Sequence, residues 1–163
     1  MTRSADPDPS APAPSGAGET HNHSHHGGCL CAAVRFHVKG APDRVGLCHC
    51  LDCRKAHGAP FNAFAVFASA QVRITGGDDG HVPPDALGAY VNAQGYRRYF
   101  CRRCGSPLHG ASEGQENEIE IPLGLFDETG LFTPTYEGWI PRREPWLGEM
   151  HTILQSYEAD RPD

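Results

Sequence analysis

The sequence lacks several features that would assign a protein to a large functional class. It has no apolar run near the length of about 18 residues that a membrane-spanning helix needs, and its first residues lack the apolar stretch of a secretory signal. It has no phosphate-cradling glycine loop, dinucleotide fingerprint or nucleophile elbow. At a formal net charge of −6, it also has no long basic stripe to meet a nucleic-acid backbone. We therefore expect a cytoplasmic protein that binds neither membranes nor nucleic acids.

Large apolar side chains are missing from residues 1–27, apart from Met1. Such a segment cannot bury enough surface to offset the entropy lost on ordering. Its histidine-rich part, residues 21–26, could capture a metal ion, but we favour a solvated tail. The remaining chain is long enough for one hydrophobic core. We predict three parts, which are a disordered tail at 1–27, one folded domain at 28–155 and a flexible C-terminus at 156–163.

Helical periodicity is weak along the chain, with residues 52–57 and 149–157 as the two segments that could form helices. Alternating or continuous apolar residues between turn signals instead predict short strands, at residues 34–38, 61–67, 71–75, 90–91, 96–100 and 118–123. The pattern is typical of a mainly β single domain of packed antiparallel sheets. Trp139 and Trp146 could line a pocket, but large aromatic side chains more often complete a core, which is what we expect.

Seven cysteines form three groups in the sequence, Cys29-Leu-Cys31, Cys48-His-Cys50-Leu-Asp-Cys53 and Cys101-Arg-Arg-Cys104. A reducing cytosol keeps thiols free, which favours metal binding or catalysis over disulfides. Seven is also an odd number, so a disulfide framework would leave one thiol over. Two cysteines one or two residues apart can both reach a tetrahedral zinc ion, so each short pair is half a site.

The pair Cys101/Cys104 has the form of a zinc knuckle, because Gly105 lets the backbone turn its amides towards sulfur. Its best complement is the pair Cys29/Cys31. Joining two pairs that lie far apart in sequence restricts the unfolded chain most, as a structural metal should. We therefore predict a closed structural zinc site with four sulfur ligands.

The remaining thiols, Cys48, Cys50 and Cys53, form a compact set with room for a fourth ligand. Three protein ligands and an open position are the general mark of a catalytic zinc. Three thiolates around Zn²⁺ leave a net charge of −1, which suits holding a substrate thiolate better than making hydroxide. The sequence thus predicts two zinc ions per chain, one structural and one catalytic.

Two other interpretations of this set stay open. It could be a second structural site, with His49, His57 or Asp52 as the fourth ligand. It could also be a redox pair of Cys50 and Cys53, although no thioredoxin-like pattern surrounds it. His49 and His57 are further candidates for proton transfer, but we favour a packing or supporting role for both.

The sequence resembles the glutathione-dependent formaldehyde-activating family, which also includes centromere protein V-like proteins. The resemblance lies in four segments, at residues 27–36, 48–61, 98–108 and 139–147, and includes all seven cysteines. It implies a small β fold of packed antiparallel sheets with two zinc ions. The resemblance implies a structural role for one cysteine set and a catalytic role for the other, matching the spacing: Cys29, Cys31, Cys101 and Cys104 are structural; Cys48, Cys50 and Cys53 are catalytic.

The family's named activity joins glutathione to formaldehyde, giving S-hydroxymethylglutathione, and is classed with the carbon–sulfur lyases. The resemblance therefore implies a zinc-dependent enzyme whose partners are a small thiol and a small aldehyde. The longer loop at residues 76–88 departs from the family pattern in a region that could shape substrate access. The competing hypothesis is a non-catalytic zinc module that binds another protein.

Overall fold

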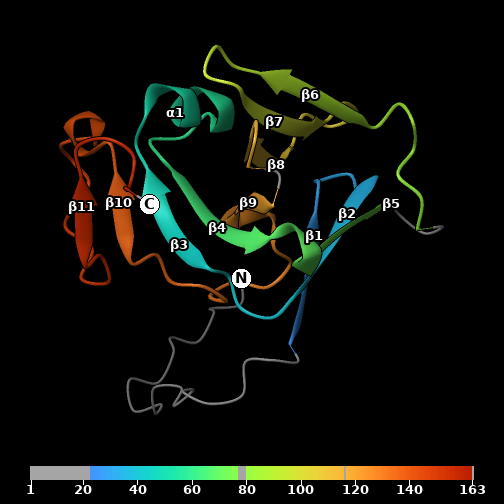
Figure 1. Ribbon diagram of the computed structural model, residues 1–163, viewed down its shortest axis with the longest axis horizontal. Helices are drawn as coiled ribbons and strands as arrows, with labels where there is room; N and C mark the ends of the chain where they lie inside the picture. The colour runs from blue at the N-terminus through green and yellow to red at the C-terminus, as the bar shows by residue number, and fades with distance from the viewer. Residues whose placement is uncertain (1–22, 77–79, 116, 163) are drawn as a thin grey trace, which may run out of the picture.

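The computed structural model describes residues 23–76, 80–115 and 117–162 (Figure 1). One short α-helix, α1 (Leu51–His57), lies among eleven strands of these residues. The strands are β1 (Ser24–Gly28), β2 (Val34–Lys39), β3 (Arg44–Cys48), β4 (Asn62–Ala68), β5 (Val72–Gly76), β6 (Leu87–Val91), β7 (Tyr96–Cys101), β8 (Pro107–Ser112), β9 (Glu118–Pro122), β10 (Tyr136–Gly138) and β11 (Gln155–Tyr157). Three 3₁₀ turns complete the set, η1 (Ser69–Gln71), η2 (Leu123–Leu125) and η3 (Ile140–Arg142).

The strands form two sheets, which confirms the mainly β fold. A small sheet has the order β1-β2-β5, and a large one has the order β11-β10-β3-β4-β9-β8-β7-β6. Figure 1 shows the small sheet at one side of the molecule, with α1 and the β6–β7 hairpin at the top. Most neighbours are antiparallel, but β10 runs parallel to both β3 and β11. None of the helices in the described part of the chain has the length and apolar character that a bilayer crossing requires.

The main hydrophobic core joins the two sheets. Its buried residues come from β2, β3, β4, β9 and the turn after η2, and they are Phe36, Val38, Val45, Ala65, Phe67, Ile121 and Phe126. Strand β4 is buried on both faces, because Phe64 and Val66 pack against Tyr136 of β10 on its other side. The predicted strand at 61–67 is therefore central in the fold, as its continuous apolar run indicated.

The folded region begins earlier than the sequence indicated. Residues 24–27, expected in the tail, belong to β1 and pair in register with β2. Backbone hydrogen bonds order this strand without large side chains, and Gly27 lets it approach the Phe36 ring closely. The first 22 residues of the predicted tail lie outside the described residues.

The C-terminal predictions differ most from the structure. The helix expected at residues 149–157 is wrong, because this segment forms turns and then β11. Strand β11 also enters the region expected to be flexible, residues 156–163. Trp146 does not belong to the core, since it is 67% exposed on a surface segment of turns. Trp139 is half-buried, and its indole Nε1 donates to Asp160 Oδ1 at 2.8 Å.

A substitution at Gly27 tests the tight packing of β1. A Cβ placed there would lie 2.3 Å from the Leu125 carbonyl oxygen and 2.3 Å from the Phe36 ring. Because a backbone atom cannot move aside cheaply, Gly27→Ala should lower the free energy of unfolding by about 1–3 kcal/mol. Gly124→Ala is the control, since nothing lies within 4 Å of its Cβ. Urea unfolding that gives equal midpoints for both variants would contradict the close approach.

Candidate functional site

The first cysteine group unites two distant turns. Cys29 and Cys31 lie between β1 and β2, whereas Cys101 ends β7 and Cys104 lies in the turn to β8. Their four Sγ atoms all lie within 4.8 Å of one another, and we call this set the four-cysteine cluster. The cluster joins the small sheet to the β7–β8 hairpin of the large sheet, as the pairing of the two motifs predicted.

Distances within the four-cysteine cluster fit a metal better than a disulfide. Cys29 Sγ lies 3.6 Å from Cys31 Sγ, which in turn lies 3.8 Å from Cys101 Sγ. Sulfurs about 2.3 Å from a tetrahedral zinc are separated by about 3.8 Å, whereas a disulfide requires about 2.05 Å. All seven cysteines have free thiols. The four-cysteine cluster can therefore hold a metal ion.

Neighbouring donors support sulfur in its ionised form. The Val34 amide donates to Cys29 Sγ at 3.3 Å. Gly105 has φ +75°, in the left-handed region where glycine costs least, so the turn closes around the knuckle as predicted. The pKa of the Cys104 thiol is lowered to about 5, first by its hydrogen bond with Ser106 Oγ, 3.3 Å away.

The second group is built at the start of α1. Cys48 is the last residue of β3, Cys50 is the N-cap of α1 and Cys53 lies one turn into the helix. Their Sγ atoms also lie within 4.8 Å of one another, and we call this set the three-cysteine cluster. Cys50 Sγ accepts a hydrogen bond from the Cys53 amide at 3.3 Å. This amide lies in the first turn of α1, where backbone donors have no partner within the helix, so the sulfur satisfies it.

Close sulfurs resist complete ionisation of the three-cysteine cluster. Hydrogen bonds from Cys48 and then from Cys53 lower the pKa of Cys50 to about 2. The hydrogen bond with Cys50 is also the main cause that raises the pKa of Cys48, to about 12. The pKa of Cys53 is raised as well, first by Cys48 and then by Cys50. One thiolate forms easily, whereas three together require a positive charge, which a metal cation would supply.

None of the three predicted alternatives for a fourth ligand joins these sulfurs. Among the described residues, the group of potential ligands that meets here consists of the three cysteines alone. Asp52 instead accepts a hydrogen bond from Asn92 Nδ2 at 2.8 Å. His57 lines a neighbouring cavity, and its pKa is lowered, first by burial and then by the charge of Arg98.

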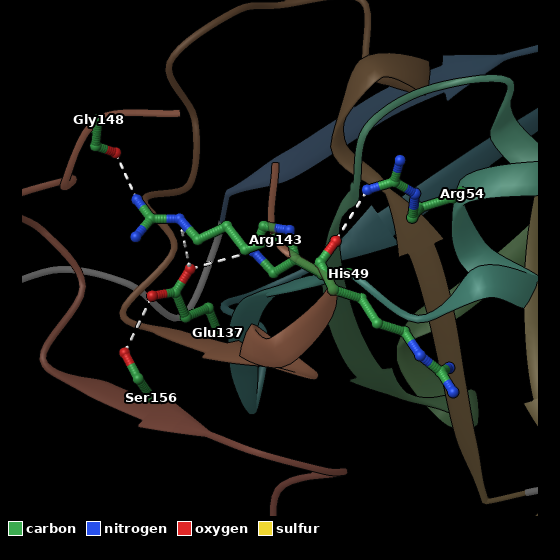
Figure 2. A network of polar contacts seen from close by, with 7 residues as sticks. His49, Arg54, Glu137, Arg143, Gly148 and Ser156 are labelled. Carbon is green, nitrogen blue, oxygen red and sulfur yellow. Dashed lines mark hydrogen bonds and ion pairs between the residues drawn. The ribbon is translucent and has the colours of Figure 1, made fainter. Parts of the chain in front are cut away.

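His49 packs in a supporting position, as we favoured from the sequence, and does not join the sulfurs as a ligand. It is fully buried, and its Nε2 lies 3.0 Å from Glu137 Oε2 of β10 (Figure 2). Ser156 Oγ of β11 donates to the other Glu137 oxygen at 2.9 Å, and Arg143 lies 3.6 Å from the carboxylate. The His49 amide also donates to the Gly138 carbonyl at 3.1 Å. These contacts fix the backbone between Cys48 and Cys50 against β10.

A second set of contacts joins α1 to the segment that follows β10 in the chain. Arg54 Nη1 donates to the Arg142 carbonyl at 2.8 Å, and its Nη2 pairs with Glu144. The Arg54 guanidinium thus binds the segment around η3. A different cation, Arg98, contacts the three-cysteine cluster, with its Nη2 at 3.7 Å from Cys53 Sγ.

A cavity of about 240 Å³ lies beside the three-cysteine cluster, between α1 and strands β7, β8 and β9. Arg98, Tyr96 and Glu120 line it, and the Arg98 guanidinium lies 4.6 Å from the centre of the Tyr96 ring. Burial raises the pKa of Glu120 to about 7, and Asn62 Nδ2 donates to its Oε1 at 3.1 Å. Neither Trp139 nor Trp146 lines this cavity.

Sequence reasoning missed Tyr96, Arg98 and Glu120 as members of the site. Glu120 stands in an alternating strand, where a polar residue ordinarily indicates solvent. Only the pairing of β9 with β4 and β8 places it beside α1. Arg98 follows Arg97 in β7. Neighbouring residues of a strand point to opposite faces, and this alternation was the signal that could have placed the two arginines on different sides of the sheet.

Two known proteins are similar to parts of this chain. A protein from Schizosaccharomyces pombe named as an uncharacterized lyase is 28% identical over 100 residues, and the match spans 61% of this chain and 66% of that protein, just under two thirds of its length. A crystal structure of a Rhodobacter sphaeroides protein, at 21% identity, matches 66% of this chain and 90% of its own with a TM-score of 0.49.

The match to a protein family is broader. It covers residues 24–142, which runs from β1 through η3 and includes both cysteine clusters. The chain belongs to the glutathione-dependent formaldehyde-activating enzyme family.

Proposed function

We propose that the chain binds two zinc ions, a structural one at the four-cysteine cluster and a catalytic one at the three-cysteine cluster. The observation that carries this proposal is the convergence of three sulfurs with no further ligand from the described residues. A cavity lies beside them, and Arg98 touches Cys53 at its edge. An open coordination position next to a cavity is the arrangement that a substrate-binding zinc requires.

The proposed reaction is that of a carbon–sulfur lyase, acting on a small thiol such as glutathione and a small aldehyde such as formaldehyde, or on their S-hydroxymethyl adduct. Zinc bound at the three-cysteine cluster would hold the thiol as a thiolate and keep its sulfur nucleophilic. In the addition, the thiol loses its proton to solvent, and a C–S bond forms at the aldehyde carbon. The C=O π electron pair moves to oxygen, which takes up a proton, so no oxidant or reductant is needed.

Residues around the sulfurs would support the thiolate. Arg98 and the amide of Cys53 both donate to sulfur, so they offset part of the negative charge that gathers there. The His49–Glu137 contact holds the Cys48–Cys50 turn in place. Seven free thiols support a reducing compartment, and we therefore propose the cytoplasm as the location.

Zinc content tests the division into two sites. Metal analysis of purified wild-type protein should give about two zinc ions per chain, and Cys50→Ser should give about one with the fold retained. Cys101→Ser should instead lower the unfolding temperature sharply, because the four-cysteine cluster joins the two sheets. Asp52→Asn, at the exposed neighbour of Cys53, is the matched control and should keep two ions. A wild type with one ion or none would defeat the catalytic assignment.

Access to the open position can be tested with cobalt. In the cobalt-substituted protein, glutathione should change the visible absorption bands, because its sulfur would become a ligand. Exchange NMR with ¹³C-formaldehyde should then show faster conversion to S-hydroxymethylglutathione with the zinc protein than without it. Cys50→Ser should abolish the acceleration, and Asp52→Asn should retain it. An unchanged cobalt spectrum, together with no acceleration, would favour the competing non-catalytic zinc module.

A further inference from the structure

The walls of the cavity beside α1 are largely apolar and aromatic. Tyr99 and Phe100 of β7 and Leu108 of β8 line it, and Ala56 of α1 lies at its exposed edge. Formaldehyde carries no substituent and would leave nearly all of the 240 Å³ unfilled. For comparison, an apolar cavity of about 150 Å³ admits a benzene molecule. The space therefore suits a ring or a compact aliphatic group.

The polar side of the cavity faces the three-cysteine cluster. Arg98 lies between the cavity and Cys53 Sγ, which is 3.7 Å from its Nη2. The Tyr96 hydroxyl lies near the Glu120 carboxyl, yet it is buried without a hydrogen bond of good geometry to any described group. A buried hydroxyl without a well-aligned acceptor is costly, so a ligand oxygen would give it a better one.

Space for the Tyr96 ring is created by Gly110, which lies across the β7–β8 pair. A Cβ at Gly110 would lie 2.1 Å from the Tyr96 hydroxyl oxygen. The buried hydroxyl thus lies against Gly110, in space that any other residue there would fill. Burial raises its pKa well above the usual range, and the charge of Glu120 adds to this, so Tyr96 remains a donor.

Charge limits what the cavity can accept. Arg98 is the cation among its lining residues, and its guanidinium is already engaged by Cys53 and the Tyr96 ring. Burial lowers the pKa of His109 to about 4, so this ring is neutral near pH 7. Glu120, whose pKa burial raises to about 7, repels an anionic substituent whenever it is ionised. A carboxylate, including those of glutathione, would have to compete with Cys53 for Arg98, so an uncharged group is favoured.

We propose that this cavity binds the substituent of the carbonyl substrate, an uncharged aldehyde that carries an aromatic or compact aliphatic group, with the Tyr96 hydroxyl donating to its carbonyl oxygen. The inference rests on the proposed thiol–aldehyde chemistry and narrows its aldehyde. The carbonyl carbon then lies on the side of the cavity nearest the sulfurs, and the thiol approaches from outside the cavity.

Binding of unreactive probes tests the site without turnover. Benzamide should bind the zinc-loaded protein in a calorimetric titration, and benzoate, its charged counterpart, should bind at least about tenfold more weakly. Ala56→Phe should narrow the cavity and weaken benzamide about tenfold or more. Lys55→Phe, at the adjacent exposed position outside the cavity, is the matched control and should bind benzamide as the wild type does. Circular dichroism and zinc content check that both variants fold.

The role of the hydroxyl has its own readout. Tyr96→Phe should weaken benzamide several-fold and leave the affinity for benzene, which has no acceptor, unchanged. The proposal would be overturned if benzoate bound as tightly as benzamide. It would also be overturned if the Ala56→Phe and Lys55→Phe proteins bound benzamide with equal affinity. If these binding results hold but no thiol adds to benzaldehyde or formaldehyde, the cavity assignment stands and the proposed enzymatic function fails. If formaldehyde is converted but benzamide does not bind, the enzymatic function stands and the cavity assignment fails.

Discussion

The convergence of four sulfurs from two distant turns is the constraint on which the rest of the structure depends. It fastens the turn between β1 and β2 to the β7–β8 hairpin, and thereby one sheet to the other. Buried Val34, Ala86 and Leu108 pack around Cys29 and Cys101, so the cluster is continuous with a hydrophobic layer. Most of the residues that line the cavity come from the same β7–β8 hairpin. The position of one cysteine set thus determines the surroundings of the other.

Electrostatics distinguishes the two cysteine sets more clearly than their spacing does. The four-cysteine cluster has an amide donor at buried Cys29 and a hydroxyl partner at half-buried Cys104. The three-cysteine cluster has a helix N-terminus on one side and an arginine on the other. Positive groups that approach from outside the ligand set favour extra negative charge, such as that of an arriving thiolate. In this respect the three-cysteine cluster suits the anionic sulfur that we propose as its ligand better than a neutral water.

The sequence predicted the parts of the site that depend on short-range spacing. Each cysteine pair stands within a few residues of its partner, so local turn geometry alone brings its sulfurs together. It did not predict Tyr96, Arg98 or Glu120, because their meeting depends on strand register between β7, β8 and β9. The same distinction applies to the fold. The apolar run in β4 marks a core strand, whereas β10 and β11 are three residues long and their parallel pairing leaves no local pattern.

Glu137 connects the three-cysteine cluster to residues much later in the chain. Its carboxylate holds His49, which stands between two of the sulfurs, and is itself held by Ser156 of β11 (Figure 2). The match to the family covers residues 24–142 and so stops before β11 begins. A chain that stopped there would keep every cysteine and the whole matched region, yet the Glu137 carboxylate beside its histidine would lose both Arg143 and Ser156. The segment that identifies the family therefore does not contain all of the residues that support the three-cysteine cluster.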